Sequence, residues 1–150
     1  KLQDQGTWQQ LVAKVSAVGT STSPYFSWHL FGGSVSTNQW RPQFQLVNSG
    51  GTSVNVSSSV AVNYGDWVHV VGVYDGAAVR IYVNGVNQGS APQSGNIIRY
   101  AQPFYIGASG LPDEFAKGLI DEVRVYAVGL SATQVQALYK APRGLRFASF

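Results

Sequence analysis

Short runs of alternating or β-branched residues recur along almost the whole chain, and they constrain the fold more than any other feature. Gly, Ser, Thr, Asn or Pro separate each run from the next, and these residues end strands and form turns. The runs cover residues 10–15, 25–31, 43–47, 53–62, 67–75, 79–83, 104–106 and 118–126. After 79–83, Asn84 and Gly85 supply the two positive-φ positions of a type I′ hairpin turn. The pattern predicts eight or more strands.

Only the segment 131–139 (SATQVQALY) has the pattern of a helix. Ser131 can cap the first turn together with Gln134, and Leu130 and Val135 occupy the two positions of a hydrophobic staple. Many short strands with one short C-terminal helix predict an all-β fold, either a two-sheet antiparallel β-sandwich or a barrel.

Composition narrows the function classes. The 150 residues fit one domain over 1–150. Because cysteine is absent, disulfides, thiolate nucleophiles and Cys-ligated zinc are excluded. The net charge of +3 comes from scattered basic residues, so we expect no nucleic-acid partner. No window approaches the ~20 apolar residues of a membrane span, so we expect no membrane insertion.

Five segments resemble the signature of the laminin-G-like jelly rolls, which are concanavalin A-like sandwiches. They are DWVHVVGVYDG (66–76), VRIYVNG (79–85), FYIG (104–107), GLIDEVRVY (118–126) and LS (130–131). The resemblance runs from Trp8 to Tyr139 and implies two packed antiparallel sheets. Such domains are commonly appended to secreted glycoside hydrolases, lyases and adhesins, where they bind glycans or proteins and often hold calcium. The resemblance therefore implies an extracellular, secreted domain within a larger protein or an assembly.

The chain departs from this family at its beginning. Family members usually have one or two more strands before the part that resembles 8–14. Either the chain is a fragment without these strands, or another strand fills their place. The tail 144–150 (GLRFASF) puts Leu145 and Phe147 on one face and is a candidate for that strand, since an unpaired edge beside an open core is costly. The alternative is a frayed tail.

The acids do not form the pattern of a hydrolase. Glycoside hydrolysis normally needs two carboxyl groups roughly 5 to 9.5 Å apart in one cleft. Asp121 and Glu122 are neighbours on a predicted strand, so their side chains point to opposite faces. His29 and His69 lie in predicted strands beside aromatics, where a packed or surface histidine is the common outcome. We expect a non-catalytic domain; the less favoured alternative is a polysaccharide-active enzyme, as a lyase using Tyr and His.

Aromatic and amide side chains favour binding. Glycan sites pair an exposed ring with amide, hydroxyl or Arg groups that fix the orientation of the sugar. The segment Asn38-Gln39-Trp40-Arg41 joins two predicted strands and is the first candidate, with Trp28 and Tyr105 as further ligand-binding candidates. The competing interpretation is that Trp40 covers the end of the sandwich.

Two other tryptophans, Trp8 and Trp67, are predicted to lie in the core, because Trp67 begins a strand of the family signature. The function predicted from the binding candidates, the segment 38–41 with Trp28 and Tyr105, is glycan binding. A protein-interaction or adhesion domain is the alternative, and it would expose a broad apolar patch.

Calcium is implied by the resemblance alone. Asp121, with the carbonyl of Gly118, resembles the position from which relatives coordinate structural Ca²⁺. A hard cation needs six to eight oxygen ligands. The competing interpretation is that Asp121 fixes strand ends by hydrogen bonds.

Overall fold

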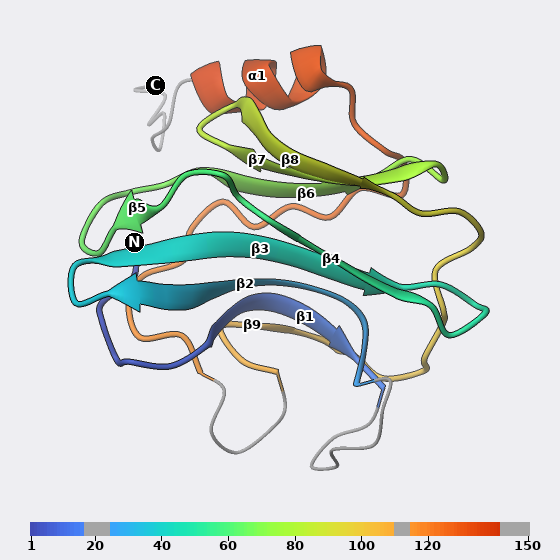
Figure 1. The fold of residues 1–150 in the computed structure, drawn as a ribbon, viewed down its shortest axis with the longest axis horizontal. Helices are drawn as coiled ribbons and strands as arrows, with labels where there is room; N and C mark the ends of the chain where they lie inside the picture. The colour runs from blue at the N-terminus through green and yellow to red at the C-terminus, as the bar shows by residue number, and fades with distance from the viewer. Residues whose placement is uncertain (17–24, 110–114, 142–150) are drawn as a thin grey trace, which may run out of the picture.

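The computed structural model describes residues 1–16, 25–109 and 115–141, which form two stacked antiparallel sheets and one helix (Figure 1). The larger sheet has the order β4 (Ser53–Ser57), β3 (Gln39–Val47), β2 (Phe26–Ser36), β1 (Gln9–Val15) and β9 (Phe104–Ile106), and β5 (Val62–Asn63) also pairs with β3. The smaller sheet has the order β6 (Val70–Tyr74), β7 (Ala78–Val83) and β8 (Val86–Pro92). Helix α1 (Ala132–Lys140) lies over the smaller sheet. The predicted all-β sandwich with one short C-terminal helix is confirmed.

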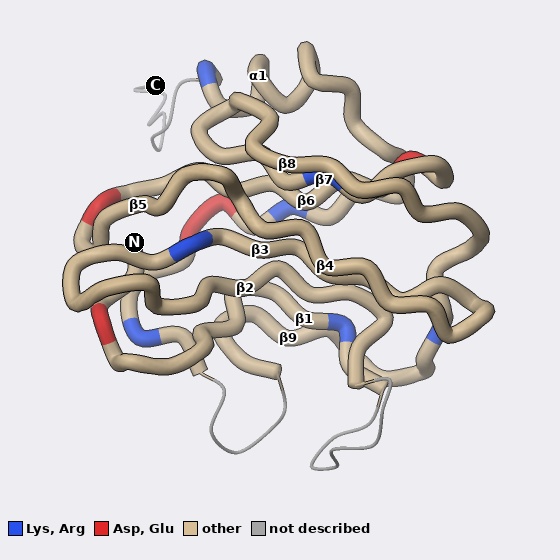
Figure 2. Tube along the Cα trace, in the orientation of Figure 1, with Lys and Arg blue, Asp and Glu red and all other residues tan. Residues whose placement is uncertain are grey.

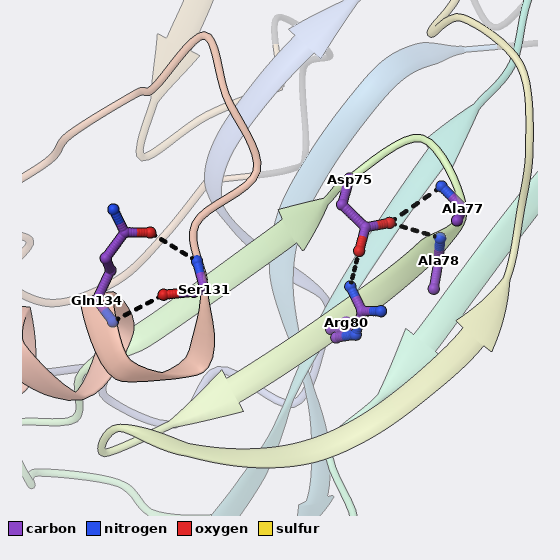
Figure 3. Close-up of polar contacts among 6 residues, drawn as sticks. All are labelled: Asp75, Ala77, Ala78, Arg80, Ser131 and Gln134. Atoms are coloured by element: carbon purple, nitrogen blue, oxygen red, sulfur yellow. Dashed lines mark hydrogen bonds and ion pairs between the residues drawn. The ribbon is translucent and has the colours of Figure 1, made fainter.

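Helix α1 begins where its capping residues predict. The Ser131 hydroxyl accepts a hydrogen bond from the Gln134 backbone N–H at 3.2 Å, and the Gln134 side-chain oxygen accepts from the Ser131 N–H at 2.8 Å (Figure 3). Two backbone donors of the first turn are thereby satisfied. Val135 is buried against Val73 and Tyr82, which fixes the helix on the smaller sheet.

Two tight turns connect the strands of the smaller sheet. Asn84 and Gly85 have φ of 50° and 80° between β7 and β8, as the Asn-Gly pair predicts. Between β6 and β7, the Asp75 carboxylate accepts from Arg80 and from the backbone N–H groups of Ala77 and Ala78 (Figure 3). These bonds, that to Arg80 first, lower the pKa of Asp75 to about 2.

The main core lies between the two sheets. Phe44 and Leu46 of β3 pack against Val79 and Ile81 of β7. Gly72 of β6 lies directly against the Phe44 ring, because a Cβ placed at Gly72 would come within 2.4 Å of it. The two layers therefore approach closely where a glycine faces an aromatic ring.

The prediction of a strand at 118–126 is wrong. The structure pairs this segment with the rest of the described chain only at an isolated bridge between Gly118 and Leu2. Glu122 has a φ of 54°, which interrupts the extended backbone that a strand needs. Strand β8 was not predicted, and the tail 144–150 lies outside the described residues. Within the described part of the chain, no helix has the length and apolar character needed to cross a membrane.

Candidate functional site

A hollow of about 440 Å³ lies at the end of the sandwich where β5 pairs with the beginning of β3. Its size falls within the range of small-ligand sites, roughly 300–1,000 Å³. An aromatic ring, several amides, a carboxylate and small apolar side chains line it: Gln39, Ala61, Val62, Asn63, Asp66, Trp67, Val68 and Asn84.

Backbone hydrogen bonds fix the three segments that form this end hollow. Gln39 pairs with Asn63 between β3 and β5, and the Tyr64 N–H donates to the Asn38 carbonyl at 2.9 Å. The turn between β7 and β8 is held by two bonds: the Asn84 N–H donates to the His69 carbonyl at 2.8 Å, and the His69 N–H donates to the Asn84 side-chain oxygen at 3.0 Å. The position of the lining side chains is therefore set by ordered backbone.

The polar side chains of the hollow form a connected row. Gln39 Nε2 donates to Asn63 Oδ1 at 3.2 Å, and Asn63 Nδ2 donates to Asp66 Oδ2 at 3.2 Å. Asn63, Asp66 and Asn84 are exposed, and Trp67 beside them is 52% exposed. The hollow thus presents an aromatic ring together with hydrogen-bond donors and acceptors in contact with solvent.

Trp40 does not lie on the surface, which corrects the expectation that it forms a binding site. It is only 2% exposed and packs over Gly32. Strand β3 begins at Gln39, so Trp40 shares the inward face with Phe44 and Leu46, which follow it by even numbers of residues. Its indole N–H has no hydrogen-bond partner among the described residues. The burial of Trp40 agrees with the competing interpretation, in which this ring has a packing role.

The three polar residues predicted to bind beside Trp40 lie in two different places. Gln39 lines the hollow, and exposed Asn38 lies beside it. Because adjacent residues of a strand face opposite ways, Arg41 points to the opposite face of β3 from Trp40. Its guanidinium donates to the carbonyls of Ser58 and Ser59 at 2.7 and 3.2 Å.

Trp28 and Tyr105 are not brought to the hollow. Trp28 is half-buried and packs against the core cluster around Phe44. Tyr105 is half-buried on β9 and packs against a cluster that contains Ala13 and Phe26. Packing accounts for both rings.

Trp8 and Trp67 correct the prediction that they belong to the core, since each is 52% exposed. Strand β6 begins only at Val70, so Trp67 remains in the loop that precedes it. Trp8 precedes β1, and its ring lies 5.4 Å from that of Phe31. The turn signal Gly65-Asp66 directly before Trp67 was the clue in the sequence that this ring could lie in a loop.

His29 is packed among aromatic rings and amide side chains of the larger sheet. The His29 ring lies between the rings of Phe26 and Phe31, at 3.9 and 4.1 Å, and its nitrogens contact Gln10 and Gln45 at 2.9 and 2.8 Å. Burial lowers the pKa of His29 to about 4, against the hydrogen bond to Gln45, which raises it. His29 is therefore neutral and packed at pH 7, as its aromatic neighbours in the sequence suggested.

The Asp121 carboxylate takes part in a local hydrogen bond, and calcium binding by Asp121 with the Gly118 carbonyl stays a prediction. Asp121 Oδ1 accepts from the Glu122 N–H at 2.8 Å, and the Glu122 carboxylate pairs with Arg124. Over residues 1–16, 25–109 and 115–141, no three His, Asp or Glu side chains gather as a metal site. Charged residues are few and scattered over the molecule (Figure 2), and Asp66 is the one acid among the residues that line the end hollow.

The fold is similar to known structures at low sequence identity. A native heptameric SAP-like pentraxin from Limulus polyphemus has 18% identity and a TM-score of 0.60, over 89% of this chain and 68% of that one. An S-layer domain-containing protein (residues 221–444) from Clostridium thermocellum ATCC 27405 has 20% identity and a TM-score of 0.48, over 91% of this chain and 65% of that one. The chain thus spans about two thirds of either structure.

A search of curated proteins found no match. A laminin-G family model, described as the concanavalin A-like lectin/glucanases superfamily, matches residues 1–136. That match covers most of the chain and agrees with the two-sheet fold. The chain therefore belongs to the concanavalin A-like lectin/glucanase superfamily.

Proposed function

We propose that this domain is a non-catalytic glycan-binding module of an extracellular protein, and that the sugar binds in the end hollow beside Trp67. The observation that carries the proposal is the half-exposed Trp67 ring next to Asn63, Asp66 and Asn84, which are all exposed. Sugars present apolar C–H faces flanked by hydroxyls, so an indole can stack on one face while amides and a carboxylate bond the hydroxyls.

The composition of the hollow supports binding without hydrolysis. Asp66 is the one carboxylate among its lining residues. Glycoside hydrolysis normally uses two carboxyl groups across the scissile bond. A lone carboxylate that already accepts a hydrogen bond from Asn63 is suited to holding a hydroxyl.

One observation favours a second candidate, a protein-interaction or adhesion domain. Large apolar side chains are exposed along one segment: Leu119, Val123, Val125, Tyr126 and Val128. Contiguous exposed apolar surface is typical of protein contacts. None of these five residues lines the end hollow, so substitutions in the segment and in the hollow can be compared.

The test is a glycan array with the wild-type domain, followed by calorimetry on the best ligand. We expect Trp67→Ala to weaken binding at least ~10-fold, because a few central aromatic residues carry most of the binding energy of a site. Trp8→Ala is the matched control, since that ring has the same 52% exposure but does not line the hollow. It should leave the affinity unchanged.

Three outcomes would count against the proposal. Loss of binding in Trp8→Ala alone would move the site to the face of the larger sheet that carries Trp8. Equal loss in both variants would point to a general effect on the fold. An array without any ligand, together with capture of a protein that is lost on Val125→Asp, would favour the interaction domain.

A further inference from the structure

The end hollow beside Trp67 carries a negative charge that no basic side chain of its lining neutralises. Asp66 is exposed and is the one carboxylate in the lining, and none of the lining residues is Lys or Arg. The ion pairs in the described part of the chain join Asp75 to Arg80 and Glu122 to Arg124. Asp66 has an amide partner instead, the Asn63 side chain. A cationic ligand group in the hollow therefore meets an unneutralised carboxylate.

The hydrogen bonds of the lining run in one direction and end on this carboxylate. Gln39 Nε2 donates to Asn63 Oδ1, and Asn63 Nδ2 donates to Asp66 Oδ2, each at 3.2 Å. An ionised carboxylate only accepts hydrogen bonds, and its two oxygens offer about four lone-pair sites. One bond from Asn63 leaves most of these sites for a ligand. The group that suits them best is one that donates several hydrogen bonds.

The nitrogen or oxygen substituents of common sugars differ in this respect. A hydroxyl and an N-acetyl amide each bring one donor together with acceptor lone pairs, whereas an ammonium group brings three donors and no acceptor. Hydrogen bonds between ionised partners are roughly twice as strong as those between neutral ones. An ammonium group is therefore the substituent that Asp66 binds most strongly.

The Trp67 ring acts in the same direction as the carboxylate. It follows Asp66 directly in the chain, lines the same hollow and is 52% exposed. The face of an indole attracts a cation that lies within about 6 Å of the ring centre, and tryptophan does so better than tyrosine or phenylalanine. One sugar unit can thus place its C–H face on the ring and its ammonium group between the ring and Asp66.

We propose that the end hollow selects sugars with a free ammonium group, such as glucosamine units, over their N-acetylated and uncharged counterparts, and that Asp66 determines this preference. The inference rests on the proposed glycan-binding function and names the class of sugar for the same site. The whole chain has a net charge of +3, which opposes general adsorption of a polycation to its surface. The preference is therefore local to the hollow.

The experiment compares three β-1,4-linked tetramers by calorimetry: those of glucosamine, N-acetylglucosamine and glucose. They differ only in the substituent at the second carbon, which is an ammonium, an acetamide or a hydroxyl group. Measurement at about pH 5.5 keeps the sugar amines protonated. We expect the glucosamine tetramer to bind at least ~5-fold more tightly than either of the others; the preference is moderate because water screens an exposed carboxylate.

The variant that tests the role of Asp66 is Asp66→Asn, which has nearly the same shape and keeps an oxygen for the hydrogen bond from Asn63. The ratio of the glucosamine and N-acetylglucosamine affinities should fall to about 1, because the charge is lost. Asp4→Asn is the matched control, since it makes the same change in net charge but does not line the hollow. It should leave the ratio unchanged.

A salt series on the wild-type domain gives the same information without a variant. At about 1 M salt the Debye length is only about 3 Å, so binding of the glucosamine tetramer should weaken at least ~3-fold. Binding of the two uncharged tetramers should change less than this. An equal effect of salt on all three tetramers would contradict an ion pair between the ligand and Asp66.

The outcomes separate this inference from the proposed function. If all three tetramers bind equally and Trp67→Ala weakens each of them, glycan binding holds and the amine preference is overturned. A preference that persists in Asp66→Asn overturns the role of Asp66. If none of the sugars binds, both proposals fail. If the peptide tetralysine binds as tightly as the glucosamine tetramer and loses its affinity in Asp66→Asn, the hollow recognises lysine side chains of a protein rather than an amino sugar.

Discussion

Replacing Trp40 with alanine tests whether this tryptophan lies in the core. The sequence predicted Trp40 at a binding surface and Trp67 in the core, and the structure shows the reverse. Trp40 is 2% exposed, whereas Trp67 is 52% exposed. A buried indole removes about 150–250 Å² from water, which at ~25 cal/mol per Å² corresponds to about 4–6 kcal/mol. Because alanine keeps part of this burial, we expect Trp40→Ala to lower the free energy of unfolding by about 3–5 kcal/mol.

The indole N–H makes a further comparison possible. It is buried without a hydrogen-bond partner among the described residues, and such a donor costs about 1–3 kcal/mol. Trp40→Phe removes this donor along with part of the ring. We expect it to be destabilising by less than half as much as Trp40→Ala.

The assay is urea unfolding followed by circular dichroism, which does not depend on the fluorescence of the replaced residue. For a chain of this size, a loss of 1 kcal/mol lowers the melting temperature by about 2–4 °C, so Trp40→Ala should melt roughly 6–20 °C lower. Trp67→Ala should change the free energy of unfolding by less than about 1 kcal/mol. An unchanged midpoint for Trp40→Ala, with a large loss for Trp67→Ala, would refute this assignment.

Three other predictions follow from the packing. The pKa of His29 falls from 6.5 to about 4 on folding, so the unfolded chain binds more protons than the folded chain between these pH values. The free energy of unfolding should therefore fall as the pH drops from about 6.5 to 4. A His29→Gln variant with the same pH dependence of its urea midpoint would contradict this. Gly72→Ala, whose Cβ would lie 2.4 Å from the Phe44 ring, should lower the free energy of unfolding by about 1–3 kcal/mol. Phe44→Leu in the same chain should restore part of that loss, and strictly additive losses would argue against the contact. Ser131→Ala removes the helix cap and should cost about 1 kcal/mol, with faster amide exchange in α1; unchanged exchange there would show that the cap is dispensable.

The sequence was most informative where local chemistry decides the structure. Strand β9, the Asn84-Gly85 turn and the Ser131 cap are found where alternation, positive φ and capping chemistry predict them. Each depends on residues that are neighbours in the chain. The sandwich was predictable for the same reason, since many short strands with one short helix have few ways to bury their apolar faces.

The candidate site was less predictable because it depends on where two strands begin. Strand β3 begins at Gln39, so Trp40 is inside it, and β6 begins at Val70, so Trp67 is outside it. A shift of a few residues at these boundaries exchanges a core ring for a surface ring. Counting back by twos from Phe44 would have placed Trp40 on the inner face, so this part could have been found. The neighbours Asn63 and Asn84 could not, because folding brings them to Trp67 from separate segments.

The contact between Gly72 and Phe44 also has a consequence for evolution. Phe44 occupies the space that a side chain at position 72 would need, so the two positions share one fixed volume across the sheet interface. In sequences that keep this sandwich, positions 44 and 72 should therefore covary, with an alanine or larger residue at 72 accompanied by an aliphatic residue at 44. A change from glycine at 72 with phenylalanine at 44 to a larger residue at 72 with an aliphatic residue at 44 requires two substitutions. The single variant with large side chains at both positions is the one that selection should remove.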